Sequence, residues 1–159
     1  MICRISKKDD LIPVINLGEQ FYTGFFPASK DEIIPKGQLI LGLSQSSGLL
    51  QMIPTFDPNI MYGQNYGYRS GLNNSMVIHL KNTVSYLKKI RPLKNGDVFL
   101  DIGSNDATLL NAISESDVIK AGIDPNIDKF KDYYSKEIYK SSEFFSKEEF
   151  NKFSIKKAC

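Results

Sequence analysis

The segment 101–106, Asp-Ile-Gly-Ser-Asn-Asp, places two carboxylates, a hydroxyl and an amide around a single glycine. The apolar run 98–100 precedes it and Ala-Thr-Leu-Leu follows it, which is the pattern of a strand, a tight turn and a helix start. Such a turn lets backbone N–H groups and a helix N-terminus approach a ligand closely. The residues that we expect to contact a small cofactor there are Asp101, Gly103, Ser104 and Asn105.

A third carboxylate follows the next apolar run. Ala-Gly-Ile at 121–123 has the pattern of a second short strand, and Asp124 comes directly after it. An acid in this place is suited to accept hydrogen bonds from a ribose. The alternative is a helix-capping role, because Pro125 fits the first position of a helix. Both roles can hold together.

The charges around the glycine favour one cofactor over another. A diphosphate group would be repelled by Asp101 and Asp106, since like charges repel in a partly buried site. S-adenosylmethionine (SAM) carries no phosphate, has a cationic sulfonium and offers an amino group as donor. The residues therefore favour SAM over NAD, although the spacing permits both. An ordinary junction of strand, turn and helix without a ligand is the structural alternative.

Composition and charge narrow the class of protein. The chain has 159 residues, of which 42% are hydrophobic, a normal share for a globular core. The net charge of +2 comes from interleaved lysines and acids, so we expect neither a nucleic-acid nor a membrane partner. No apolar run approaches the roughly 20 residues of a membrane span, and the N-terminus lacks the apolar centre of a signal peptide. The two cysteines, Cys3 and Cys159, form no disulfide framework, which predicts a cytoplasmic setting.

Residues 1–60 have the pattern of a small β-rich unit. The runs 14–18 and 39–43 are strand-like, and 49–52 is a further short strand. Prolines and glycines between these runs mark turns. The aromatic residues that we expect to form most of the core of this unit are Phe21, Tyr22, Phe25 and Phe26.

A loop rich in tyrosine and glycine follows at 61–71. Two roles are open for it: closing over a cofactor, or packing between the small unit and the next helix. The residues concerned are Tyr66, Tyr68, Arg69 and Ser70.

The spacing of apolar residues then predicts an amphipathic helix. It begins near 73–75, where a polar side chain caps it, and Pro92 ends it. The residues on its apolar face are Met76, Leu80, Val84 and Leu87. His79, the only histidine, lies on this helix, and we interpret it as structural or solvent-facing rather than catalytic.

Residues 95–159 have the pattern of an α/β unit. Strands at 98–102 and up to 123 are followed by a predicted helix at 126–134, a third strand at 137–140 and a helix over 146–153. Ser146 is placed to cap the last helix, with Glu149 as its capping-box partner. The charged residues of 128–157 are interpreted as solvated helix faces.

Motifs along the whole chain resemble the SAM-dependent sugar C-methyltransferases. Asp-Ile-Gly-Ser-Asn-Asp-Ala-Thr-Leu-Leu at 101–110, followed by Gly-Ile-Asp-Pro at 122–125, is similar to the motif pair of that family. Asn-Leu-Gly at 16–18, Gly-Leu-Leu-Gln at 48–51 and Tyr-Gly-Tyr-Arg-Ser at 66–70 resemble it in the same order, as does Met76 with His79-Leu80. These class I enzymes act on nucleotide-linked deoxysugars and carry a small N-terminal zinc-binding domain. The resemblance implies SAM as cofactor, a nucleotide-linked sugar as substrate, and Tyr68 beside the cofactor.

The resemblance also implies a fold and a division of the chain. The expected fold class is α/β: the N-terminal part of a class I, Rossmann-like methyltransferase sheet, preceded by a small zinc-ribbon-like β unit. The expected domains are a degenerate zinc-binding-type domain at 1–60, a tyrosine-rich loop and linking helix at 61–94, and the N-terminal half of the SAM-binding domain at 95–159.

The zinc ligands of the family are mostly missing. The family has C-R-x-C and later C-x-x-C-G, whereas this chain has Cys-Arg-Ile-Ser at 3–6 and Ser-Gln-Ser-Ser-Gly at 44–48. Serine is a poor zinc ligand because its hydroxyl stays protonated near neutral pH, while structural zinc takes four nitrogen or sulfur donors. We therefore expect no metal, and specifically no zinc.

Two further departures concern the cofactor half. Ala107 stands where the family has glycine, which is tolerable at a first helical turn if its φ is negative. The catalytic residues of the family lie beyond the part that this chain resembles, so catalytic residues are unassigned. We expect the cofactor-binding part of a methyltransferase. The alternatives are an inactive remnant, one half of a split enzyme completed by a C-terminal chain, or a non-catalytic binding module.

Overall fold

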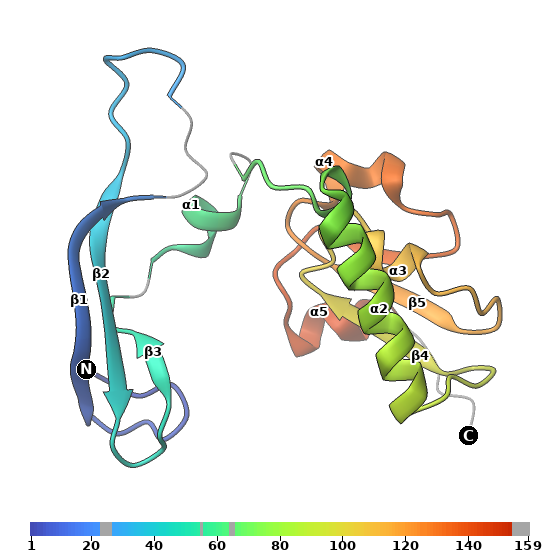
Figure 1. The fold of residues 1–159 in the computed structure, drawn as a ribbon, viewed down its shortest axis with the longest axis horizontal. Helices are drawn as coiled ribbons and strands as arrows, with labels where there is room; N and C mark the ends of the chain where they lie inside the picture. The colour runs from blue at the N-terminus through green and yellow to red at the C-terminus, as the bar shows by residue number, and fades with distance from the viewer. Residues whose placement is uncertain (23–26, 55, 64–65, 154–159) are drawn as a thin grey trace. The chain divides into compact units, whose positions relative to one another are not determined.

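The computed structural model describes residues 1–22, 27–54, 56–63 and 66–153. The protein is a mixed α/β structure with a three-stranded antiparallel sheet and a three-stranded parallel sheet (Figure 1). The chain divides into two compact units, Met1–Tyr66 and Gly67–Cys159. Among the described residues, none of the helices has both the length and the apolar character needed to cross a membrane.

The unit Met1–Tyr66 is built on the antiparallel sheet. Its strands are β1 (Leu11–Phe21), β2 (Lys36–Ser44) and β3 (Leu50–Met52), in that order, followed by helix α1 (Pro58–Tyr62). The predicted runs 14–18 and 39–43 lie within β1 and β2, and the run 49–52 contains β3, which begins one residue later, at Leu50. The pairing of β1 with β2 shifts register twice, between Pro13 and Ile15 and between Asn16 and Glu19.

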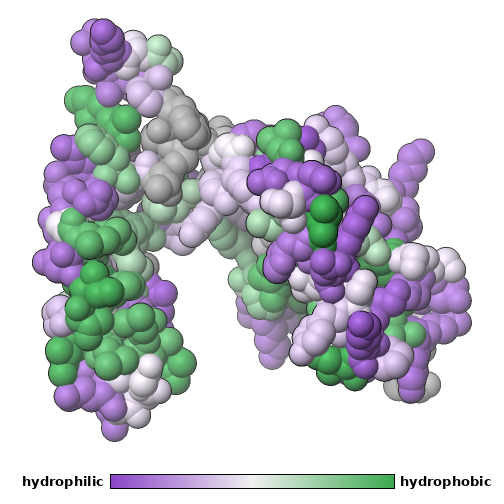
Figure 2. Space-filling model, in the orientation of Figure 1, coloured by the Kyte–Doolittle hydropathy of each residue, from purple (hydrophilic) through white to green (hydrophobic). Residues whose placement is uncertain are grey.

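Apolar side chains of this unit stay largely on its surface. Figure 2 shows them gathered over the strands β1 and β2. The expectation that Phe21 belongs to the core is wrong, because its side chain is 58% exposed. Tyr22 is half-buried and meets the ring of Phe56 edge to face, with centroids 5.0 Å apart. Phe25 and Phe26 lie outside the described residues.

The unit Gly67–Cys159 is built on the parallel sheet. Its strands are β4 (Val98–Ile102), β5 (Ile119–Ile123) and β6 (Tyr139–Ser141), with β5 in the middle. Asp101 pairs with Gly122 and Ile102 with Ile123, so β4 and β5 end side by side. Helix α3 (Thr108–Asn111) lies in the first connection, and the second holds α4 (Ile127–Phe130) and the 3-10 turn η2 (Lys131–Tyr133).

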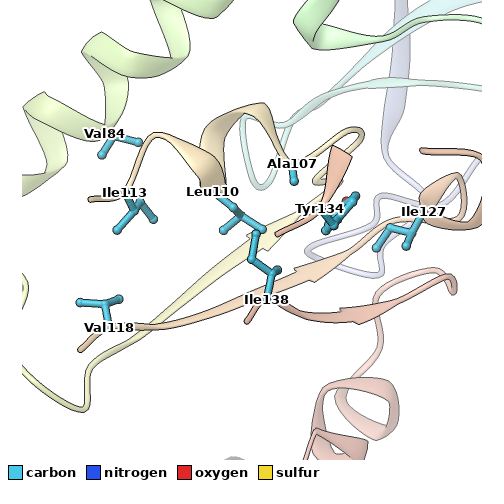
Figure 3. Packing of buried hydrophobic residues seen from close by; sticks show 8 residues of the cluster. All are labelled: Val84, Ala107, Leu110, Ile113, Val118, Ile127, Tyr134 and Ile138. Carbon is cyan, nitrogen blue, oxygen red and sulfur yellow. The ribbon is translucent and has the colours of Figure 1, made fainter. Parts of the chain in front are cut away.

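Helix α2 (Asn74–Ile90) belongs to this second unit. Asn73 caps it by accepting a hydrogen bond from the backbone N–H of Ser75, as the sequence predicts. On its apolar face Val84 is buried, Met76 and Leu80 are half-buried, and Leu87 is 40% exposed. Figure 3 shows how the core forms below it, with Leu110 pointing from α3 toward Ile138 and the sheet. The buried cluster consists of Val84, Ala107, Leu110, Ile113, Val118, Ile127, Tyr134 and Ile138.

The later elements are shorter than the sequence pattern predicts. The helix predicted at 126–134 is α4 continued by η2, and the third strand covers 139–141 rather than 137–140. Ser146 does cap the last helix, α5 (Lys147–Lys152), by accepting from the backbone N–H of Glu149. The Glu149 carboxylate accepts instead from the hydroxyl of Ser141, at the end of β6, and pairs with Lys152.

Candidate functional site

The turn after β4 contains left-handed backbone conformations, which residues other than glycine rarely adopt. Gly103 has a φ of +78° and donates its N–H to the carbonyl of Ile123 over 2.8 Å, so the turn begins against the end of β5. A Cβ at Gly103 would meet nothing within 4 Å, and space above this glycine is therefore open. A closely approaching ligand could contact the backbone there.

Two other residues of the turn share this left-handed conformation. Asn105 has a φ of +49°, which asparagine tolerates better than most residues. Ala107 has a φ of +61° and is fully buried. The negative φ that would make alanine unstrained at this position is therefore absent, and Ala107 carries a backbone cost of about 1–2 kcal/mol that glycine would avoid. Its methyl group offsets part of that cost by packing in the core cluster.

The carboxylate of Asp124 lies at the end of β5 and holds two loops in place. One oxygen accepts from the backbone N–H of Asn105 over 3.0 Å, and the other accepts from the backbone N–H of Asn126 over 2.7 Å. The second bond is the local turn expected of an acid before proline, although α4 begins only at Ile127. Asp124 is 7% exposed. Each oxygen keeps one lone pair, so the carboxylate retains the capacity to accept from a ribose hydroxyl.

Asp101 lies on β4 beside this network and has a perturbed acidity. Burial, and secondarily the negative charge of Asp124, raises the pKa of Asp101 from 3.8 to about 6. Two carboxylates at the ends of adjacent parallel strands form a local negative field. Such a field attracts a cation and repels a phosphate.

The Ser104 side chain is buried and hydrogen-bonded beneath the turn, so it does not face the open space above Gly103. Its hydroxyl lies 2.8 Å from the hydroxyl of Tyr134, and it is 4% exposed. Tyr134 also donates to the carbonyl of Asn105 over 2.9 Å. Burial is the first cause that raises the pKa of Tyr134 above its usual value, so this phenol stays a neutral donor. Nothing in the spacing of the sequence marks Tyr134 as part of this network.

Close packing beneath the turn requires another glycine. A Cβ at Gly122 would lie 2.7 Å from the hydroxyl oxygen of Ser104. The middle strand therefore lets the turn settle directly onto the sheet.

The tyrosine-rich loop is latched onto this turn by Asn105 and Asp106. The Asn105 amide accepts from the backbone N–H of Ser70 over 2.9 Å and donates to the carbonyl of Tyr68 over 3.1 Å. Asp106 accepts from the backbone N–H of Gly71 over 2.9 Å. We call these contacts between residues 68–71 and residues 105–106 the loop latch.

Asp106 is the buried charge at the centre of the loop latch. Its side chain is 1% exposed and pairs with the guanidinium of Arg69 over 3.4 Å. Its other oxygen accepts from the hydroxyl of Thr108, 2.5 Å away, and from the backbone N–H of the same residue. The Arg69 guanidinium also lies 4.2 Å from the ring centroid of Tyr133. A Cβ at Gly71 would lie 2.7 Å from the Asp106 carboxylate, which explains the glycine in the loop.

The structure places five of the six predicted cofactor-binding residues on the turn after β4 or at the carboxyl ends of β4 and β5. Tyr68 joins them through its carbonyl, while its side chain is 43% exposed. His79 lies on α2 and is exposed. Two cavities, of about 570 and 510 Å³, are lined by other residues.

The serines that replace the zinc ligands of the resembled family do come together. The sulfur of Cys3 lies 3.2 Å from the hydroxyl oxygen of Ser47, and it accepts from the backbone N–H of Ser6 over 3.4 Å. Ser44 donates its hydroxyl to Asp10 over 3.0 Å and accepts from the backbone N–H of Ser47. Cys3 and Ser44 are fully buried. Among the described residues, no group of three or more histidines, cysteines or acids is placed to hold a metal ion.

Taken together, the second unit presents carboxylates, open space over a glycine and a hydrogen-bonded loop at the carboxyl ends of two parallel strands. This arrangement suits a cationic ligand with hydroxyl and amino donors. No protein-family model matches the chain, and no curated protein matches it in sequence.

Proposed function

We propose that the chain binds S-adenosylmethionine over the carboxyl ends of β4 and β5, in a Rossmann-like unit, and serves methyl transfer. One observation carries the proposal: Asp101 and Asp124 lie at the carboxyl ends of two adjacent parallel strands, beside a glycine turn with open space above Gly103. Ligands of open parallel sheets bind at this edge.

Charge decides between the cofactors that such a turn accepts. The raised pKa of Asp101 reflects burial and the charge of Asp124, so a cation placed there would favour the ionised carboxyl. A dinucleotide would bring a diphosphate into the same field at an energetic cost. SAM brings a sulfonium and an ammonium instead.

Particular residues would hold particular parts of the cofactor. Asp101 would pair with the ammonium of the methionine part, Asp124 would accept from a ribose hydroxyl with its remaining lone pairs, and the Gly103 turn would approach the methionine part through its backbone. The bound cofactor supplies an electrophilic methyl group. The residues of this chain supply its alignment, which is the main requirement for an in-line displacement.

The proposed substrate is a nucleotide-linked sugar, and the support for it is the family resemblance of the motifs at 101–110, 122–125 and 66–70. The catalytic acid or base is unassigned. A chain that binds SAM without transferring the methyl group would be a binding module. Measuring both SAM binding and methyl transfer to a sugar acceptor distinguishes this module from an enzyme.

Isothermal titration of the full chain with SAM tests the proposal. We expect binding in the micromolar range, and weaker binding of S-adenosylhomocysteine, which lacks the positive charge of the sulfonium. Asp101→Asn should weaken SAM binding at least about tenfold, because it removes a charge-assisted hydrogen bond worth about 1.5–3 kcal/mol. Asp132→Asn removes the same charge from an exposed position on η2 and should leave binding unchanged. Equal affinity for both ligands, or an unchanged Asp101→Asn variant, would contradict the charge argument.

A further inference from the structure

An aromatic cavity in the unit Met1–Tyr66 shares no residue with the proposed cofactor site. Its volume is about 570 Å³, within the usual range of small-molecule pockets. Residues of β1, β2, β3 and α1 contribute to its wall. The ring and thioether side chains that line it are Phe21, Tyr22, Phe56, Tyr62, Met52 and Met61.

Gly37 on β2 fixes part of this wall. A Cβ there would lie 2.3 Å from Cε1 of Phe56 and 2.9 Å from Cε1 of Tyr22, so the two rings reach the strand only because residue 37 has no side chain. The same rings meet edge to face. A wall of rings presents flat π-faces, and planar ligands pack well on such faces.

The charged lining of the cavity has one sign. Of the twelve described lining residues, Arg4 alone is charged, and Gln20 adds an amide. The ammonium of Lys36 lies 4.6 Å from the ring centroid of Phe21, although it also pairs with Glu19. An arginine in the lining of an aromatic cavity is suited to a ligand that joins a carboxylate or phosphate to a planar group.

We propose that this cavity binds a small planar aromatic ligand that carries a negative charge. A nucleotide and an aromatic carboxylate share this chemistry. The proposal does not depend on the SAM site, and either can fail without the other.

Titration of the full chain with uridine monophosphate and with benzoate tests the proposal and separates the two sources. We expect at least one of them to bind with a Kd below about 1 mM, and uridine, which lacks the charge, to bind at least about fivefold more weakly than its monophosphate. Binding of the monophosphate alone identifies the ligand as a nucleotide, and binding of benzoate alone identifies an aromatic carboxylate. The proposal is overturned if neither anion binds.

Variants locate the binding. Arg4→Gln should weaken binding of the anion about fivefold. Lys89→Gln removes an equal charge from α2 and should leave the affinity unchanged. Gly37→Ala should abolish binding because its methyl group would displace Phe56 and Tyr22. Circular dichroism reports whether Gly37→Ala still folds. If Gly37→Ala does not fold, the test rests on Arg4→Gln, because Arg4 is exposed and its substitution should not disturb folding. An unchanged affinity of Arg4→Gln for the anion would overturn the proposal.

Discussion

The carboxylate of Asp124 accepts a hydrogen bond from the backbone N–H of Asn105, 3.0 Å away. This bond joins the end of β5 to the turn after β4, and it holds Asn105 in its left-handed conformation. Asn105 in turn carries two bonds of the loop latch. The acid that the sequence marks as a ribose acceptor is therefore also the residue that sets the shape of the turn, so its substitution will affect folding and binding together.

Asp106→Asn should destabilise the second unit by about 1–3 kcal/mol, measured by urea unfolding. Every oxygen of Asp106 accepts from donors: Gly71 and Arg69 on one side, Thr108 on the other. An asparagine amide must turn its NH2 toward one of these pairs and leave buried donors without acceptors. Hydrogen exchange at Gly71 should accelerate. Asp132→Asn is the exposed control, and a loss no larger than in that control would mean that the loop latch contributes nothing to stability.

The ionisation of Asp101 should make stability fall as pH rises from about 4 to about 6. The pKa of Asp101 is raised from 3.8 in the unfolded chain to about 6 in the folded protein. The folded state therefore binds the proton more tightly, and stability from this group is present below pH 4 and lost above pH 6. The full loss is about 3 kcal/mol.

The Asp101→Asn variant isolates this contribution. It lacks the titrating carboxyl, so it should gain stability relative to the natural chain as pH rises from 4 to 7, while losing affinity for SAM. Asp132→Asn, which removes a carboxylate from an exposed position on η2, is the matched control and should keep the pH profile of the natural chain. A pH profile of unfolding that is identical for Asp101→Asn and the natural chain would refute the buried-carboxyl account.

Ala107→Gly should change stability by less than about 1 kcal/mol. Relief of left-handed strain stabilises by about 1–2 kcal/mol, while the lost buried methyl group costs about 0.8 kcal/mol and the added freedom of the unfolded glycine about 0.5–1 kcal/mol. Ala107→Val keeps the positive φ and adds a branched side chain in a fully buried position, so thermal unfolding should show a much larger loss. Comparable losses in the two variants would contradict the φ of +61°.

Cysteines introduced at three serine positions should convert the serine cluster into a zinc site. Ser47 already lies within hydrogen-bond distance of both Cys3 and Ser44, and Ser6 joins the cluster by donating its backbone N–H to the sulfur of Cys3. A Ser6→Cys, Ser44→Cys, Ser47→Cys variant should bind about one zinc per chain and melt at a higher temperature with zinc than without it. Metal analysis of the natural chain should find no stoichiometric zinc. Zinc bound by the natural chain would show that our interpretation of the serines is wrong.

The sequence predicts the regular elements well and the connections between distant segments poorly. Strands β4 and β5, the glycine turn and the caps at Asn73 and Ser146 follow from local patterns of a few residues. The conformation of Ala107 does not, because the positive φ is imposed by the packing around the turn. The position of the tyrosine-rich loop does not follow from local patterns either, because it depends on the contacts of residues 68–71 with Asn105 and Asp106.

Tyr134 and Arg69 show the same limit at the candidate site. Tyr134 reaches the turn from a position 29 residues beyond Asn105, and Arg69 meets Asp106 across 37 residues of sequence. A tyrosine after a short helix and an arginine in a loop have no periodic signal. The carboxylates at 101 and 124 were predictable because each directly ends an apolar strand pattern, and parallel strands bring such positions to one edge.

Calorimetric titration of the full chain with SAM decides whether this protein binds the proposed cofactor. We expect saturable binding with a Kd in the micromolar range, weakened at least about tenfold by Asp101→Asn and not by Asp132→Asn. Absence of SAM binding up to about 1 mM by the folded natural chain would contradict it.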